Sequence, residues 1–287
     1  MRLYVSDLDG TLLDPSGRLR PRCRDGLNEL LDAGLPFTVA SARSVHSIAP
    51  ILDGLRLRLP VLEFNGAYLT ELDTRRVHFC RSIADDIVLD VVQRGRVAGL
   101  AVTVSTYDGQ AQRFYMPASP PNAGVAWYLE DRQRAGDARL QLVADPAAEV
   151  AAQLADEQRV VCLTFIAREA QLRPLQRGID GSCGERVRTL CSENRYSPGW
   201  YWLTVHDARA TKAHGLRELA QHCGVGLSEV TVFGDEINDV PMFEVAGRSV
   251  AVGNAVPDLQ AIADELIDDH ASGSVVRYLQ ARRASGT

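Results

Sequence analysis

Four aspartates in two short segments are the residues of this sequence best suited to chemistry. Asp7 and Asp9 belong to DLDGT, which follows an apolar stretch, and Asp235 and Asp239 belong to GDEIND, which follows another. Residues two apart in an extended chain point the same way, so Asp7 and Asp9 are expected to face one site. Like charges this close call for a cation or a shared proton, and oxygen ligands favour Mg²⁺.

Two further polar residues stand where an apolar strand or a loop gives way to a helix. Ser41 follows the apolar segment 35–40, and its hydroxyl and the backbone N–H groups after it are able to face an anion at the start of the next helix. Lys212 opens a helix, where the helix dipole disfavours a positive charge. Lys212 is therefore either an ordinary surface lysine or a charge held for an anionic ligand.

These residues must be positioned by alternating strands and helices. Apolar segments predict strands at 3–6, 35–40, 61–64, 230–233, 249–252 and 266–267. Helices are predicted from 21, after 44, over 211–223, after 235, from 257 and from 273. This rhythm predicts a Rossmann-like, doubly wound α/β domain with a parallel sheet between helices. Ligands of such sheets bind at the carboxyl ends of the strands, where the candidate residues lie.

Between these two parts the pattern changes to hairpins and separate helices. Phe64 and Thr211 are 147 positions apart, whereas a βαβ crossover takes about 30 residues. Strands are predicted at 101–105, 112–116, 160–166, 187–191 and 201–205, with helices at 84–97, 123–134, 147–155 and 169–177. We therefore expect a core domain of residues 1–82 and 205–287, interrupted by an inserted α+β domain of residues 83–204.

Composition excludes several classes of protein. A net charge of −6 argues against a nucleic-acid surface. No apolar run approaches the roughly 20 residues that cross a bilayer, and the first residues turn acidic too early for a signal peptide. The six cysteines are scattered without metal-ligand spacing, so zinc is not expected. We expect a cytoplasmic protein with reduced thiols, no membrane partner and no nucleic-acid partner.

The quoted residues resemble the haloacid dehalogenase superfamily. Its four motifs correspond to Asp7-x-Asp9-Gly10-Thr11, to Ser41, to Lys212 and to the final GDEIND segment, in the family's order. The inserted domain resembles the C2-type cap of the Cof-like phosphatases (type IIB). The resemblance covers the core domain, but only the general architecture of the cap. Ala42 departs from the family pattern, which has glycine in a Thr-Gly-Arg triplet.

The resemblance implies a mechanism and a metal site. Asp7 would attack phosphorus, and Asp9 would protonate the leaving oxygen and then activate water. Magnesium would be held by Asp7, by Asp9 through its carbonyl and by Asp235, with Asp239 and Asn238 in support.

The same resemblance implies phosphate and substrate contacts. Ser41, Ala42, Thr11 and Lys212 would bind phosphate, and Lys212 would also restrain the nucleophile. The substrate candidates on the core side are Arg43, Asn65 and Asn238. The implied partner is a small phosphorylated metabolite, with sugar phosphates as the default and nucleotide or cofactor phosphates left open. A monomer or a homodimer is expected.

Two other functions are compatible with part of the pattern. A phosphoryl-transfer mutase would use the same intermediate, but in this superfamily it typically has a smaller cap between the first two motifs. A non-catalytic phosphoacceptor would be shorter and would lack an acid at position 9. The aromatic residues Trp127, Tyr128, Trp200 and Trp202 either stack on a substrate ring or pack in the inserted domain.

Overall fold

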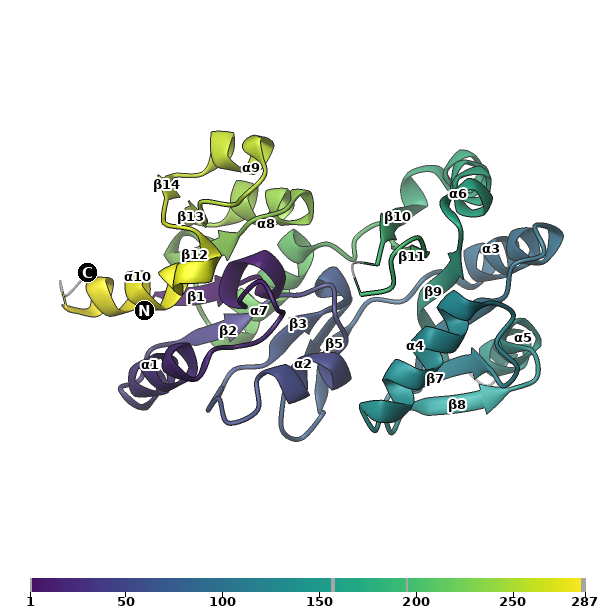
Figure 1. Cartoon of the computed structure of the whole chain (residues 1–287), viewed down its shortest axis with the longest axis horizontal. Coiled ribbons are helices and arrows are strands. Elements are labelled where there is room, and N and C mark those ends of the chain that lie inside the picture. Colours follow the sequence, from purple (N-terminus) through teal and green to yellow (C-terminus); the bar gives the residue numbers. More distant parts are fainter. Residues whose placement is uncertain (1, 156–157, 195, 285–287) are drawn as a thin grey trace. The chain divides into compact units, whose positions relative to one another are not determined.

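The computed structural model describes residues 2–155, 158–194 and 196–284. The chain divides into two compact units (Figure 1). The core unit comprises residues 1–79 and 211–287, and the inserted unit comprises residues 80–210. The second transition falls after 210, rather than at the expected 204/205, because the last strand of the inserted unit runs on to Asp207.

The core unit is built on a parallel sheet with the strand order β14-β13-β12-β1-β2. Its strands are β1 (Leu3–Ser6), β2 (Phe37–Val39), β12 (Val230–Gly234), β13 (Arg248–Ala251) and β14 (Glu265–Leu266). Strands β1 and β12 lie side by side at its centre, although more than 220 residues separate them in the chain. Both are fully buried, as parallel strands covered on two faces must be.

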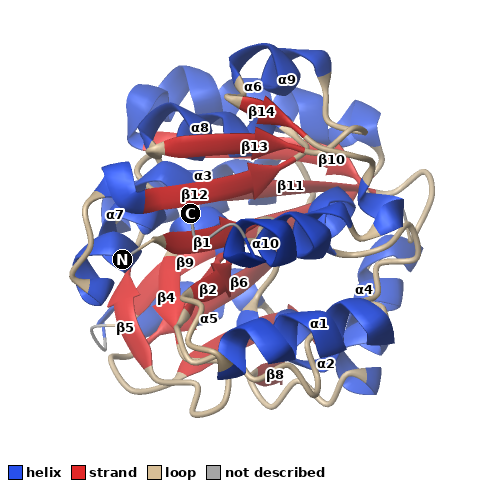
Figure 2. Ribbon diagram, turned by 90° about the vertical axis from the view of Figure 1, so that its left-hand side faces the viewer, coloured by secondary structure: helices blue, strands red, loops and turns tan. Residues whose placement is uncertain are grey.

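Helices lie on both sides of this sheet (Figure 2). They are α1 (Pro21–Asp32), α2 (Val45–Ile51), α7 (Lys212–Cys223), α8 (Val240–Val245), α9 (Pro257–Ile262) and α10 (Ser274–Ala284). Helix α1 packs against α10, and α7 packs against α8. The doubly wound α/β fold predicted from the sequence is thus confirmed.

The third predicted strand does not extend the parallel sheet as expected. Strand β3 (Val61–Glu63) joins it through a single bridge between Ala40 and Leu62. It instead belongs to a small sheet with β4 (Tyr68–Thr70) and β5 (Val77–Cys80), in which β3 and β4 run antiparallel. The short connection between β3 and β4 allows this antiparallel pairing, whereas a parallel neighbour needs a long crossover.

The inserted unit contains a six-stranded sheet with the order β10-β11-β9-β6-β7-β8. Its strands are β6 (Val102–Tyr107), β7 (Gln112–Pro117), β8 (Leu140–Val143), β9 (Arg159–Ala167), β10 (Val187–Glu193) and β11 (Tyr201–Asp207). Its helices are α3 (Asp85–Val97), α4 (Ala123–Arg134), α5 (Pro146–Ala155) and α6 (Glu169–Cys183). Strand β8, like β5 of the core unit, was not predicted; each is only four residues long, too short for its alternation to stand out.

Each unit has its own apolar core, and among the residues that the structure describes these buried clusters do not mix residues of the two units. All six cysteines lie within the described ranges and are free. Among the described helices, none combines the length and hydropathy that a bilayer-spanning segment requires.

Candidate active site

Asp7 and Asp235 come together because their strands are neighbours. Asp7 directly follows β1 and Asp235 directly follows β12, and these two strands pair in parallel with Ser6 opposite Phe233. The N–H of Asp7 continues this ladder by donating to the carbonyl of Phe233 over 2.9 Å. The carboxyl ends of the two central strands therefore carry one acid each at the same edge of the sheet.

Lys212 links the nucleophile candidate to a second carboxylate. Its ammonium donates to Oδ1 of Asp7 and, over 2.6 Å, to Oδ1 of Asp239. The Lys212 side chain is fully buried at the first turn of α7, and Asp239 is buried as well. Burial alone lowers the pKa of Lys212, but Asp239 and Asp7 outweigh it and raise that pKa above its ordinary value. Lys212 is thus a permanently charged group held for anions, and not a surface lysine.

The composition of the chain gives a further sign of this role. The sequence contains 31 basic residues, and Lys212 is the one lysine among them. Lysine is a compact point charge with three donors, whereas arginine presents a broad planar group. The single departure from arginine therefore occurs where a compact donor must fit between two buried carboxylates. The presence of a single lysine is thus a sequence signal for Lys212 that is independent of its motif.

The electrostatics of the acidic group fit a divalent cation. Carboxylate oxygens of Asp7, Asp235 and Asp239 lie within 4.8 Å of one another. Burial raises the pKa of Asp7 well above its usual value; Lys212 opposes this, while Asp239 and Asp235 raise it further. Burial likewise raises the pKa of Asp235, to about 7. Three clustered carboxylates face one ammonium, so two positive charges are needed to balance the group.

Two glycines allow the acids to approach so closely. A Cβ at Gly10, whose φ is +82°, would lie 2.1 Å from Oδ2 of Asp235. A Cβ at Gly234 would lie 2.6 Å from Oδ2 of Asp239. Any side chain at either position would push a carboxylate out of the group.

Asp239 and Thr11 contact protein groups in this arrangement. Oδ2 of Asp239 accepts from the N–H groups of Asp235 and Glu236 at 2.9 and 3.1 Å, while its Oδ1 accepts from Lys212. Asp239 therefore fixes the turn that carries Asp235. The Thr11 hydroxyl, expected to bind phosphate, donates to Oδ1 of Asp235 over 2.8 Å. Thr11 orients an acid here.

The segment after β2 places a hydroxyl and an arginine at the same edge. Ser41 is buried, and its Oγ accepts from the N–H of Arg43 over 3.1 Å. Ala42 between them is exposed. The Arg43 guanidinium, expected to contact substrate, makes two hydrogen bonds to the carboxylate of Asp9, of 2.6 and 2.7 Å.

The loop after β3 joins three of the candidate segments. Its residues Phe64, Asn65 and Gly66 have φ values of +49°, +55° and +93°. The Asn65 N–H donates to the Ser41 carbonyl over 2.9 Å, and its side-chain oxygen accepts from Asn238 over 3.1 Å. Asn65 and Asn238, both expected to contact substrate, are thus bonded to each other.

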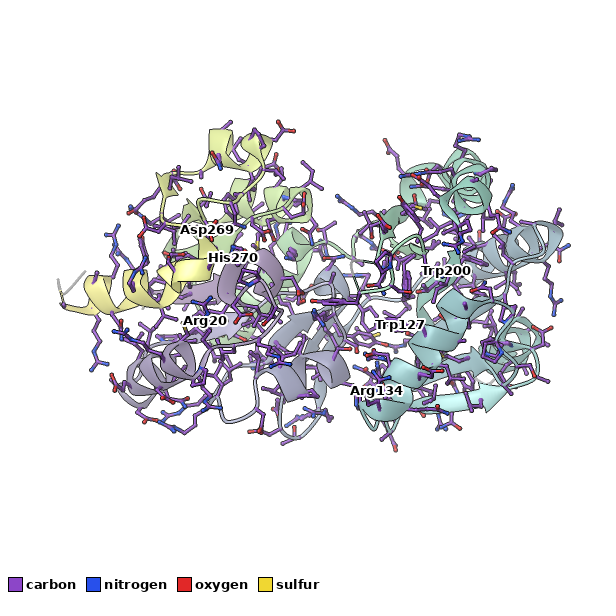
Figure 3. The ribbon with its side chains drawn as sticks, viewed as in Figure 1. Arg20, Trp127, Arg134, Trp200, Asp269 and His270 are labelled. Atoms are coloured by element: carbon purple, nitrogen blue, oxygen red, sulfur yellow. The ribbon has the colours of Figure 1, made fainter. Side chains whose placement is uncertain are left out.

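Two supporting residues were not among the sequence candidates. Glu63 is buried and accepts from the Val45 N–H at the start of α2, over 2.6 Å. Asn254 donates to the Gly10 carbonyl over 2.8 Å and accepts from the His270 N–H over 3.1 Å. Figure 3 labels His270 on the loop that Asn254 ties to the Asp9 turn. The available sequence signal for Glu63 was an acid at the end of an apolar strand.

The aromatic residues of the inserted unit contact one another. The Trp202 ring lies 6.1 Å from Trp127 and 5.8 Å from Tyr128, measured between centroids. Trp200 carries the Arg168 guanidinium 4.0 Å above its ring. Trp127 and Trp200, labelled in Figure 3, come from α4 and from the residue before β11. These contacts account for the aromatic spacing by packing within the unit.

Several known proteins are similar to this chain in sequence or in fold. A family model described as haloacid dehalogenase-like hydrolase matches residues 4–279. Pyridoxal phosphate phosphatase YbhA of Escherichia coli is 26% identical, with 97% of both chains covered. The 5-amino-6-(5-phospho-D-ribitylamino)uracil phosphatase YitU of Bacillus subtilis is 21% identical, covering 97% of this chain and 96% of that protein. The solved HAD subclass IIB sugar phosphatase BT4131 has the same fold, with a TM-score of 0.69, 20% identity and coverage of 100% and 99%.

Proposed function

Because the chain belongs to the haloacid dehalogenase-like hydrolase family, we propose that it is a Mg²⁺-dependent phosphatase of small phosphorylated metabolites. The reaction would proceed through an aspartyl-phosphate on Asp7. The observation that carries this proposal is the position of Asp7: a buried carboxylate at a strand end, bonded to the buried ammonium of Lys212.

Asp7 has the surroundings that a nucleophilic carboxylate requires. Attack forms a bond between a carboxylate oxygen and phosphorus and breaks the bond from phosphorus to the ester oxygen. Lys212 opposes the effect of burial on the pKa of Asp7 and so favours its ionised form, and it would also balance negative charge on the phosphoryl group. The side chain of Asp239 holds Lys212 from the other side.

Asp9 completes the cycle as acid and base. Two residues beyond Asp7, it would give a proton to the departing alcohol oxygen. Water then attacks phosphorus and gives its proton to Asp9, so that inorganic phosphate leaves and the Asp7 carboxylate is restored. Ser41 and the Ala42 N–H are proposed to bind phosphate oxygens beside Lys212.

Asp7, Asp235 and the Asp9 carbonyl would hold the metal, with Asp239 in support. Bound Mg²⁺ would supply charge neutralisation for the carboxylates and for the phosphoryl oxygens. Thr11 and the turn N–H groups keep Asp235 and Asp239 in place for this.

The substrate class rests on the names of similar proteins. The relatives named above are phosphatases of a pyridoxal phosphate and of a phosphoribityl compound, and a structural neighbour is called a sugar phosphatase. All are small phosphorylated metabolites, and we keep sugar phosphates as the first candidates. We propose that the inserted unit selects among them, as caps of this family do.

Phosphate release from sugar, nucleotide and cofactor phosphates tests the proposal, with Mg²⁺ or EDTA. We expect turnover that EDTA abolishes and that Asp7→Asn reduces by at least about 1000-fold. Asp32→Asn is the matched control, because Asp32 is an exposed acid paired with Arg56. Turnover retained in Asp7→Asn would refute the proposal. Lasting label on Asp7 without phosphate release would indicate a phosphoacceptor, and phosphate passed to a second sugar would indicate a mutase.

A further inference from the structure

The ion pair between Arg43 and Asp9 brings a residue from the β2–α2 loop to the carboxylate proposed as acid and base. Nε of Arg43 donates to Oδ2 of Asp9 over 2.6 Å, and Nη2 donates to Oδ1 over 2.7 Å. Both carboxylate oxygens are therefore held in one plane by a rigid group. The pair is partly buried, with side-chain exposures of 25% for Arg43 and 32% for Asp9.

The backbone of Arg43 is fixed on both sides. Its N–H donates to Oγ of Ser41 over 3.1 Å, and its carbonyl accepts from the N–H of Phe64 over 3.1 Å. Phe64 and Asn65 adopt left-handed φ values of +49° and +55°, which side-chain-bearing residues rarely accept. Such strain persists only where surrounding contacts hold it. The guanidinium thus extends from a rigid support.

Three acids of the site have different side-chain partners, while Asp239 shares Lys212 with Asp7. Asp7 is bonded to Lys212, Asp235 to Thr11, and Asp9 to Arg43. The backbone beyond Asp9 is held through Gly10, whose carbonyl accepts from Asn254. The direction of the Asp9 carboxylate is set by Arg43.

We propose that Arg43 is a positioning residue that orients Asp9 for proton transfer, in place of the substrate contact expected from the sequence. The inference rests on the proposed function. Proton transfer by a placed side chain contributes about 100- to 10,000-fold to a rate. A misplacement of about 1 Å is enough to lose about 100-fold. A carboxylate free to rotate would lose much of this advantage.

Leaving groups of different basicity separate the two roles of Arg43. An alkyl phosphate needs a proton on its departing oxygen, whereas 2,4-dinitrophenolate departs without one. If Arg43 acts through Asp9, Arg43→Ala lowers kcat/KM for the alkyl ester by about 100-fold and for the dinitrophenyl ester by less than about 5-fold. Asp9→Asn shows the same contrast, and adding Arg43→Ala to it causes little further loss. Arg43→Lys recovers only part, because one ammonium cannot hold both oxygens in plane.

The matched control is Arg56→Ala. Arg56 also makes two hydrogen bonds to one carboxylate, that of Asp32, but on the surface. We expect this variant to keep wild-type kcat/KM for both esters. Thermal unfolding of each variant establishes that it is folded.

Equal losses on both esters would overturn the inference. The inference would also be overturned if Arg43→Ala caused the same loss of kcat/KM in the Asp9→Asn variant as in the wild type. Either result would mean that Arg43 contacts the phosphate directly. These outcomes leave the proposed function intact if Asp7→Asn is inactive. If Asp7→Asn hydrolyses the dinitrophenyl ester as wild type does, the proposed function itself fails.

Discussion

At the scale of single residues, Lys212 shows how burial and charge together define a functional group. The side chain lies in the interior with two carboxylates as partners, Asp7 and Asp239. Removing the Lys212 ammonium would leave these two carboxylates buried without compensation, which is strongly destabilising. The charged residues of the candidate site therefore also contribute to the stability of the core unit.

Because the chain has one lysine, amine-reactive labelling reports on Lys212 alone among its side chains. The two ion pairs keep the ammonium protonated, and burial keeps it out of reach of the reagent. We expect peptide mapping after treatment with an N-hydroxysuccinimide ester to find no acylated Lys212 in the native protein. Complete acylation is expected in denaturant. Fast modification of the folded protein would contradict the buried arrangement.

A second residue-scale prediction concerns His206 in the inserted unit. Burial lowers the pKa of His206 to about 4, from an ordinary value of 6.5. The unfolded chain therefore binds a proton between pH 6.5 and 4 that the folded chain does not, so stability falls as the pH decreases through this window. The loss approaches about 3 kcal/mol at pH 4.

Urea unfolding of wild type and His206→Gln measures this effect. The wild type should lose more stability than the variant between pH 7 and pH 4.5, with little difference in slope above pH 7. Parallel pH profiles for the two proteins would show that His206 does not titrate as its burial requires.

At the scale of elements, the loop Phe64–Gly66 connects the segments that carry the site. It bonds to Ser41 and Arg43 through its backbone and to Asn238 through a side chain. Gly66 also lies directly against the first turn of α7, where its Cβ would come 2.4 Å from the Thr211 carbonyl. The position of Lys212 at that turn thus depends on the absence of a side chain at residue 66.

Gly66→Ala should therefore be more harmful than a glycine substitution in open space. Left-handed backbone costs an alanine about 1 kcal/mol, and the clash with α7 adds about 1–3 kcal/mol. The matched control is Gly34→Ala, since Gly34 has φ +86° but no atom within 4 Å of its Cβ position. We expect a lower melting temperature and reduced phosphate release for Gly66→Ala, and only slight destabilisation for Gly34→Ala. Similar melting temperatures for the two variants would show that the close approach is unimportant.

At the scale of the whole molecule, the two units have separate cores. The acids named above for the candidate site, and Lys212, all belong to the core unit. A buried cluster of its own, centred on residues such as Val104, Leu163 and Leu203, supports the sheet of the inserted unit. An independent core is the physical requirement for independent folding.

We therefore expect residues 80–210, expressed alone, to fold. Circular dichroism should show mixed helix and strand content, and urea unfolding should be a single cooperative transition. The fragment is expected to release no phosphate from any ester. Amide exchange without protected strands would show that the inserted unit depends on the rest of the chain.

The sequence by itself determined most of the strands and helices, and the acids that follow two of the strands. Asp7 and Asp235 were identifiable because an apolar strand followed by an Asp–Gly turn is a local pattern, and parallel strands bring such turns to one edge. The insertion was identifiable from the length between Phe64 and Thr211. Both signals depend only on neighbouring residues or on chain length.

Tertiary structure alone decided which side chains meet. Thr11 and Asp235 are 224 positions apart, and Arg43 and Asp9 are 34 apart, so no local pattern pairs them. The antiparallel pairing of β3 with β4 could not be predicted either, because the sequence of a short apolar strand does not indicate which strand it pairs with. Which side chains form hydrogen bonds follows from the packing of the whole core unit. This packing brings Thr11 to Asp235 and Arg43 to Asp9.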